Sequence, residues 1–218
     1  MLDVAATTET EGLRERKKRR TRQAIAEAAM DLFKAHGFDA VTVADVARAA
    51  EVSEKTVFNY FPTKEDLVMH GGEERLATII DAIRTRPPGT PLVKPFRDAT
   101  MALVEAIDRG PAEDIVAVPR LVAESKTLRD RLFLAWEQEA AALSPVVAEE
   151  IGAREGDLVP AVVARTLAWA RRMVFRAAFQ RLLAGEDRHE VAADLRRQAR
   201  RVYDQLERGL ADYGVKPR

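Results

Sequence analysis

The chain of 218 residues contains no cysteine, and this absence excludes several kinds of chemistry. Without thiols it can form no disulfide bond, no thiolate metal site and no cysteine nucleophile. The three histidines, His36, His70 and His189, lie far apart in the sequence, and none belongs to an HExxH metal motif. No phosphate-binding glycine loop or nucleophile elbow is present either. We therefore expect no metal, no cofactor and no enzymatic activity.

The chain also lacks an overall charge and a long apolar run. Its 35 Lys and Arg residues balance 35 Asp and Glu residues, so no global field attracts it to nucleic acid. No apolar run approaches the roughly 18 residues of a membrane span. The first residues, MLDVAATTETEGL, lack the basic and apolar regions of a signal peptide. We expect a cytoplasmic protein with no membrane partner.

Strand-type alternation is absent as well, and the periodicity predicts an all-α fold of about nine helices. Residues 1–13 are polar and aperiodic, and we expect a mobile tail there. The most apolar helix is expected over residues 157–184, with Arg165, Arg172, Arg176 and Gln180 on a narrow polar stripe. The helices are expected at about residues 14–36, 43–49, 54–60, 63–86, 92–108, 113–125, 128–151, 157–184 and 189–213.

Three helix starts follow one another in residues 41–64, and each has its own cap. Thr42 with Asp45 and Thr63 with Asp66 have the spacing of capping boxes, and Ser53 is a cap between them. Only about three residues separate the first two helices, which is typical of a helix-turn-helix. In that motif the second helix, here Glu54–Tyr60, enters the DNA major groove.

The expected recognition helix has an unusual outward face. Val57 and Phe61 are four residues apart and should be buried together. Asparagine can pair with adenine, a phenol can bond phosphate, and an aromatic ring can touch a thymine methyl group. The alternative is a helical hairpin in which Phe58 and Tyr60 pack against a neighbouring helix. The side chains left to face outward are Lys55, Thr56, Phe58, Asn59 and Tyr60.

Residues 14–22, RERKKRRTR, are the most basic segment of the chain. They hold seven Arg or Lys residues and one Glu, a net charge of +6. Beside a helix-turn-helix, such a segment favours contact with phosphates or the minor groove, with Arg19 and Arg20 as candidates. Taken alone, the segment is equally consistent with a solvated helix end.

The run TVADVARAAEVSEKTVFNYFPTKEDL, with RQAIAEAAMDLFKAHGFDAVTV upstream, resembles the DNA-binding core of the TetR family of bacterial regulators. The resemblance covers about residues 18–68. One departure is Glu51, since the family usually has glycine at this point of the turn. A Glu with positive φ there costs on the order of 1 kcal/mol relative to Gly.

The resemblance implies a helix-turn-helix domain over residues 14–64 and an effector-binding and dimerisation domain over residues 65–218. The implied function is that of a ligand-responsive repressor that binds a palindromic operator in double-stranded DNA. The homodimer would form through residues 157–184 and 189–213. Phosphates would be held by Thr42, Ser53, Lys64 and the basic segment. A transcriptional activator, or a helical small-molecule-binding protein that has lost DNA binding, remains an alternative.

The run PRLVAESKTLRDRL and the closing helix loosely resemble actinobacterial regulators, some tied to lipid or redox-cofactor metabolism, and this resemblance implies a medium-sized apolar or acyl effector. Aromatic and methionine side chains at helical spacing are usually core residues, so the pocket candidates have an ordinary structural alternative. Trp169 falls within the polar stripe and should be exposed or covered by a second subunit. The candidates are Phe96, Met101, Leu121, Phe133, Trp136, Trp169 and Met173.

Overall fold

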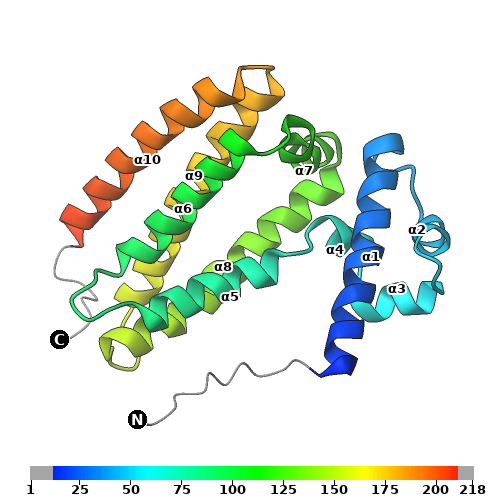
Figure 1. Ribbon diagram of the computed structural model, residues 1–218. Helices are drawn as coiled ribbons and strands as arrows, with labels where there is room; N and C mark the ends of the chain where they lie inside the picture. The colour runs from blue at the N-terminus through cyan, green and yellow to red at the C-terminus, as the bar shows by residue number, and fades with distance from the viewer. Residues whose placement is uncertain (1–11, 211–218) are drawn as a thin grey trace, which may run out of the picture. The chain divides into compact units, whose positions relative to one another are not determined.

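The computed structural model describes residues 12–210, which form ten helices and no strand (Figure 1). The prediction of an all-α fold is confirmed. The predicted tail at residues 1–13 lies outside the described residues except for its last two positions, and Leu13 already begins α1. The helices are α1 Leu13–His36, α2 Val43–Ala49, α3 Glu54–Tyr60, α4 Lys64–Val68, α5 Gly72–Thr85, α6 Val93–Arg109, α7 Ala112–Glu124, α8 Lys126–Ile151, α9 Val159–Leu183 and α10 Arg188–Gly209.

The sequence predicts an interruption at Gly71 and Gly72, as a kink or a 3₁₀ stretch, in the helix over residues 63–86. The structure divides this helix into α4 and α5, so residues 12–210 form ten helices rather than about nine. Gly71 lies between α4 and α5 and has a left-handed backbone, with φ +80° and ψ −5°. A left-handed residue cannot continue a right-handed helix, and only glycine adopts that conformation without a steric cost. The first compact unit ends at His70 and the second begins at Gly71.

In the first unit, α1 packs against α2 and α4, and α2 packs against α3. The apolar face of α1 contributes Ile25, Ala29 and Phe33, which have no exposed surface. Phe38, just after α1, lies at 5.2 Å from Phe33 between ring centroids. These contacts hold the short helices, whose seven or fewer residues would not be stable alone.

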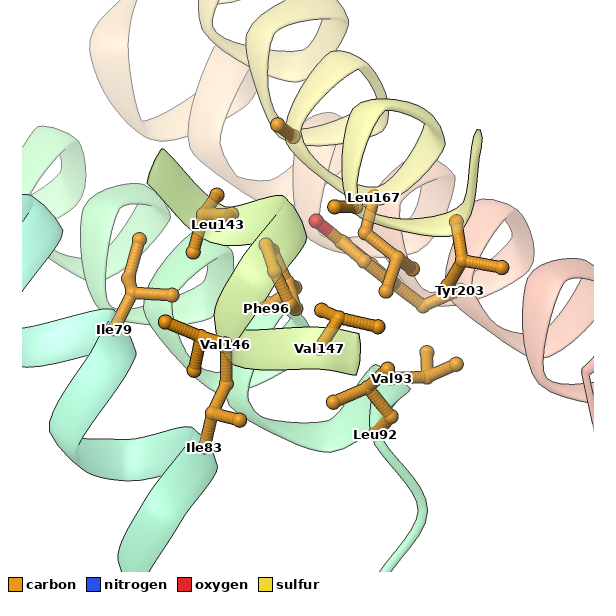
Figure 2. Packing of buried hydrophobic residues seen from close by; sticks show 13 residues of the cluster. Ile79, Ile83, Leu92, Val93, Phe96, Leu143, Val146, Val147, Leu167 and Tyr203 are labelled. Atoms are coloured by element: carbon orange, nitrogen blue, oxygen red, sulfur yellow. The ribbon is translucent and has the colours of Figure 1, made fainter. Parts of the chain in front are cut away.

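In the second unit, the main core is formed by α5, α6, α8 and α9, with Tyr203 entering from α10 (Figure 2). The Tyr203 hydroxyl lies 2.7 Å from the Thr100 hydroxyl of α6, and both side chains are fully buried. This hydrogen bond satisfies two polar groups that would be costly to bury alone. A second cluster lies where α6, α9 and α10 pack together.

Between residues 12 and 210, no helix is both long enough and apolar enough to cross a bilayer.

Candidate nucleic-acid interface

The start of α2 is fixed by the predicted capping box. The Thr42 side chain accepts a hydrogen bond from the Asp45 backbone N–H at 3.2 Å. In return, the Asp45 carboxylate accepts from the Thr42 hydroxyl at 2.6 Å and from its N–H at 2.9 Å. These hydrogen bonds lower the pKa of Asp45 below its usual value. The predicted caps at Ser53 and Thr63 are confirmed in the same way.

The turn between α2 and α3 requires a left-handed residue, and that residue is Glu51, with φ +53°. Two backbone hydrogen bonds close the turn, from Glu51 N–H to Arg48 at 3.3 Å and from Val52 N–H to Ala47 at 2.9 Å. The conformation is therefore strained by about 1 kcal/mol relative to glycine, as the sequence suggested. The motif forms in spite of this substitution.

The inward side of α3 is apolar, as predicted. Val57 and Phe61 are each 1% exposed and belong to the core of the first unit. Phe58 is 46% exposed, and Lys55 and Asn59 are also exposed. Of the two aromatic residues in the helical-hairpin alternative, Phe58 is thus exposed in the structure, whereas Tyr60 is half-buried.

The remaining two candidates on α3, Thr56 and Tyr60, are half-buried. The Thr56 hydroxyl lies 2.8 Å from the Ser53 hydroxyl, which also accepts from the Thr56 N–H at 3.1 Å. Thr56 thus contributes to the helix cap. The side chains that α3 presents most openly are those of Lys55, Phe58 and Asn59.

The candidates for phosphate contacts have structural roles as well. The Thr42 hydroxyl is directed at Asp45 and the Ser53 hydroxyl at Thr56. The Lys64 ammonium lies 4.3 Å from the ring centroid of Phe38 and 6.0 Å from that of Phe33, in the range of cation–π attraction. Partial burial lowers the pKa of Lys64, and the nearby acid Asp39 opposes this shift. Removing Lys64 would therefore change packing as well as charge.

The basic segment forms the first turns of α1. Its cations at positions 14 and 16–20 are exposed, whereas Arg22 is half-buried, with its guanidinium carbon 5.1 Å from the ring centroid of Phe61. Like charges stand four residues apart at positions 14 and 18 and at positions 16 and 20. Such pairs destabilise a helix, as do cations at the positive end of its dipole. Residues 23–70 contain only four Lys or Arg against eight Asp or Glu, so this segment supplies the positive charge of the unit.

The structure does not bring the predicted pocket residues together. Phe96 is fully buried in the main core of the second unit, and Met101 packs against the second cluster. Phe133 is 57% exposed, and Trp169 and Met173 are each 45% exposed. Leu121 is buried on α7. Only Trp136 and Trp169 form a pair, edge to face with 6.5 Å between ring centroids.

Two buried arginines on α9 were missed by the sequence reasoning. Arg172, predicted to lie on the polar stripe, is 5% exposed, and its neighbour Arg171 is 9% exposed. Both donate to Glu139 of α8. The signal in the sequence is the adjacent pair of arginines in the middle of the most apolar helix.

Among the described residues, no group of three or more His, Asp or Glu side chains is arranged to hold a metal ion.

Comparisons with known proteins agree with the helix-turn-helix geometry. Residues 25–70 match the family described as bacterial regulatory proteins, tetR family. The chain is 30% identical to TcmR of Streptomyces glaucescens, an HTH-type transcriptional regulator, over 150 residues. That match covers 66% of this chain and 65% of TcmR, slightly less than two thirds of the relative.

Two further matches extend over the second unit. MftR of Mycobacterium tuberculosis, a transcriptional regulator proposed for mycofactocin biosynthesis, is 28% identical over 184 residues, which cover 78% of this chain and 84% of MftR. The structure of SmeT in complex with triclosan covers 87% of this chain and 91% of SmeT, with a TM-score of 0.57 and 15% identity, and shows the shared fold. Residues 25–70 therefore belong to the TetR family of bacterial regulatory proteins, and the relatives that match more of the chain are transcriptional regulators.

Proposed function

We propose that the protein is a ligand-responsive repressor that binds a palindromic operator as a homodimer. The observation that carries this proposal is the outward face of α3, where Lys55, Phe58 and Asn59 are all exposed. An exposed phenylalanine beside an amide and a cation suits a base-contacting surface. The basic start of α1 supplies contacts to phosphates.

Within this proposal, the contacts have separate roles. Asn59 pairs with a base edge, and Phe58 and Tyr60 contact a thymine methyl group and the backbone. Lys64, Arg19 and Arg20 neutralise phosphates and carry no sequence information. An effector bound in the second unit would release the operator by changing the spacing of the two recognition helices in the dimer.

The homodimer is proposed to form through α9 and α10, as expected from residues 157–184 and 189–213. Leu158, Val162, Trp169 and Met173 share one side of α9, and all four are exposed in the single chain. A row of large apolar side chains along a whole helix is typical of a face that is covered in the assembly. Val202 adds an exposed apolar residue on α10. A twofold pairing would also place two recognition helices on the two half-sites of a palindrome.

Replacing Val162 with aspartate tests this interface. Val162 is 61% exposed, so the single chain should still fold, but a charge at the dimer face should be left without water or a partner. We expect the variant to be largely monomeric by light scattering and to bind the operator at least about tenfold more weakly, since each half-site is then bound alone.

The matched control is Leu134→Asp, which places the same charge at an exposed apolar residue of α8 outside the proposed interface. It should remain dimeric. If Val162→Asp is as dimeric as the wild type, the proposed interface is wrong. This conclusion does not depend on whether the protein binds DNA.

Selection from a random duplex-DNA library with the purified protein tests sequence recognition. The wild type should enrich a palindrome, and a Phe58→Ala, Asn59→Ala variant should enrich nothing or a degenerate version of it. Both side chains are exposed, so the variant should keep the melting temperature of the wild type. A good contact to one base gives about 1–3 kcal/mol of discrimination per half-site, which the variant should lose.

A folded dimeric wild type that enriches no sequence even at low salt would contradict the proposal. That result would favour a helical protein that binds small molecules and has no DNA target.

A further inference from the structure

A group of buried charges in the second unit is not balanced. Arg171 and Arg172 of α9 both donate to one carboxylate, that of Glu139 on α8, and the bond from Arg172 is 3.4 Å long. Only 15% of the Glu139 side chain is exposed. A buried charge without a counter-charge is costly, so two buried cations on one anion leave a demand for negative charge.

The hydrogen-bonding capacity of the two arginines is also incompletely used. Arg172 donates to the backbone carbonyl of Trp136 in addition to Glu139. The Nε atoms of Arg171 and Arg172 are buried and have no hydrogen-bond partner among the described residues. A guanidinium offers five donors in a planar fork, which suits the oxygens of a carboxylate or phosphate.

A third arginine adds to the positive charge from α5. Burial lowers the pKa of Arg75, the nearby positive charge of Arg171 lowers it further, and Glu139 and Glu74 oppose the shift. Arg75 thus lies within the electrostatic range of the α9 pair. Glu137 also acts on Arg172, but its carboxylate lies 3.0 Å from Arg165, so Glu139 is the carboxylate that Arg171 and Arg172 share.

Aromatic rings flank the two guanidinium groups. The Arg171 guanidinium carbon lies 5.5 Å from the ring centroid of Phe175, and that of Arg172 lies 5.4 Å from that of Trp136. Trp169 contacts Trp136 edge to face. A ligand bound there would therefore meet cations and apolar rings together.

From these contacts we propose that Arg171 and Arg172, with Arg75 beside them, bind the anionic group of a small organic molecule whose apolar body contacts Trp136 and Phe175. This inference rests on the proposed function, since it assigns the chemical class of the effector of that repressor. The effector is an amphipathic carboxylate or phosphate instead of a neutral apolar compound. Arg75 belongs to the first turn of α5, the helix that begins directly after the left-handed Gly71, so an anion that binds Arg75 acts on the segment that connects the two units along the chain.

The test uses the full chain without DNA and three probes of equal chain length: octanoate, octyl phosphate and octan-1-ol. The only two tryptophans of the sequence, Trp136 and Trp169, lie at the site, so intrinsic fluorescence reports binding directly. We expect both anions to change the fluorescence and raise the melting temperature, and octan-1-ol to bind at least about tenfold more weakly. The ratio between octanoate and octyl phosphate identifies the preferred head group.

Three variants distinguish a binding site from a purely structural ion pair. Arg171→Met and Arg172→Met each leave one arginine on Glu139, and each should weaken octanoate binding by roughly thirtyfold or more, which is typical for loss of one partner of a buried charge pair. Glu139→Gln removes the carboxylate that competes with the anionic group of the ligand for the two arginines. This variant should melt at a lower temperature than the wild type, bind octanoate more tightly and regain stability as octanoate is added. Arg120→Met, at an exposed position of α7, is the matched control and should bind octanoate as the wild type does.

Three results would overturn the inference. One is equal binding of octan-1-ol and octanoate that does not depend on the arginines. Another is equal binding of inorganic phosphate and octyl phosphate, which would show that the apolar body of the ligand does not contribute to binding. The third is an absence of any response in both the wild type and Glu139→Gln. None of these results would change the operator sequence that the wild type selects from the DNA library. A wrong effector class can therefore be distinguished from a wrong proposed function.

Discussion

Replacing Lys18, Arg19 and Arg20 with alanine is expected to lower the affinity for the operator by roughly a hundredfold at about 0.1 M salt. Each phosphate that a protein neutralises contributes about 0.9 to the slope of log K against log salt concentration, so the slope should fall by about 2 to 3. The effect should be large because residues 23–70 carry more acids than bases, and the basic segment supplies the positive charge of the first unit. Alanine is the best helix former, so the fold of α1 should be kept.

The matched control removes three cations elsewhere. Arg109, Arg120 and Arg154 are exposed residues of the second unit, and their replacement by alanine changes the net charge of the chain by the same amount. Operator affinity and salt slope of this control should stay close to those of the wild type. Titrations of fluorescent operator DNA over a range of salt concentrations measure both quantities. If the two triple variants behave alike, net charge matters and the position of the basic segment does not.

Replacing Glu150 with alanine is expected to lower the free energy of unfolding by about 3–5 kcal/mol. Glu150 accepts a hydrogen bond at 2.5 Å from Arg86, whose side chain is only 2% exposed. Arg86 also donates to the backbone carbonyl of Ile83 and, at 3.4 Å, to that of Thr90. Without Glu150, the guanidinium stays buried and loses the carboxylate that lies 2.5 Å from it, which is the costly way to break such a pair.

The neighbouring acid provides the control for this prediction. Glu149 lies 3.2 Å from Arg84, but the two side chains are 68% and 53% exposed. An exposed pair of this kind contributes about 0–1 kcal/mol, so Glu149→Ala should be nearly neutral. Urea unfolding at a fixed protein concentration compares the two variants, because dimerisation would make stability depend on concentration. A loss of less than 1 kcal/mol for Glu150→Ala would show that Arg86 is solvated or paired otherwise.

The helix-turn-helix could be read from the sequence because its determinants are local. Thr42, Ser53 and Thr63 cap helices that start within a few residues, and a cap depends only on neighbouring backbone groups. The inward positions Val57 and Phe61 follow from the helical period alone. Local chemistry and tertiary packing agree throughout this stretch, which makes it predictable.

The end of α4 was predicted less well, because glycine only permits a break and does not require one. The pair Gly71–Gly72 was consistent with a kink in one helix, and the structure shows a left-handed residue that separates two helices. Which outcome occurs depends on what each helix packs against, and that is not encoded in the local propensity.

The buried charges could not be placed from periodicity. Arg172 was expected on the polar stripe of its helix, since arginine usually faces water. In the structure it is buried, and it forms an ion pair with Glu139 of α8. The surroundings of the pocket candidates could not be predicted for a related reason: apolar side chains at helical spacing can face the core, the solvent or another subunit. Phe96 and Trp169 satisfy the same pattern and lie in opposite environments.

The crowding of cations at the start of α1 links the folding of that helix to the composition of the solution. Added salt screens the repulsion between positions 14 and 18 and between positions 16 and 20, so it stabilises the first turns of the helix. The same salt competes with phosphates and weakens association with DNA. Higher ionic strength therefore stabilises the helical conformation of this segment but lowers its affinity for DNA. In the proposed complex, operator phosphates would act in one direction on both, since they would supply the counter-charge that stabilises the helix and would also hold the protein on DNA.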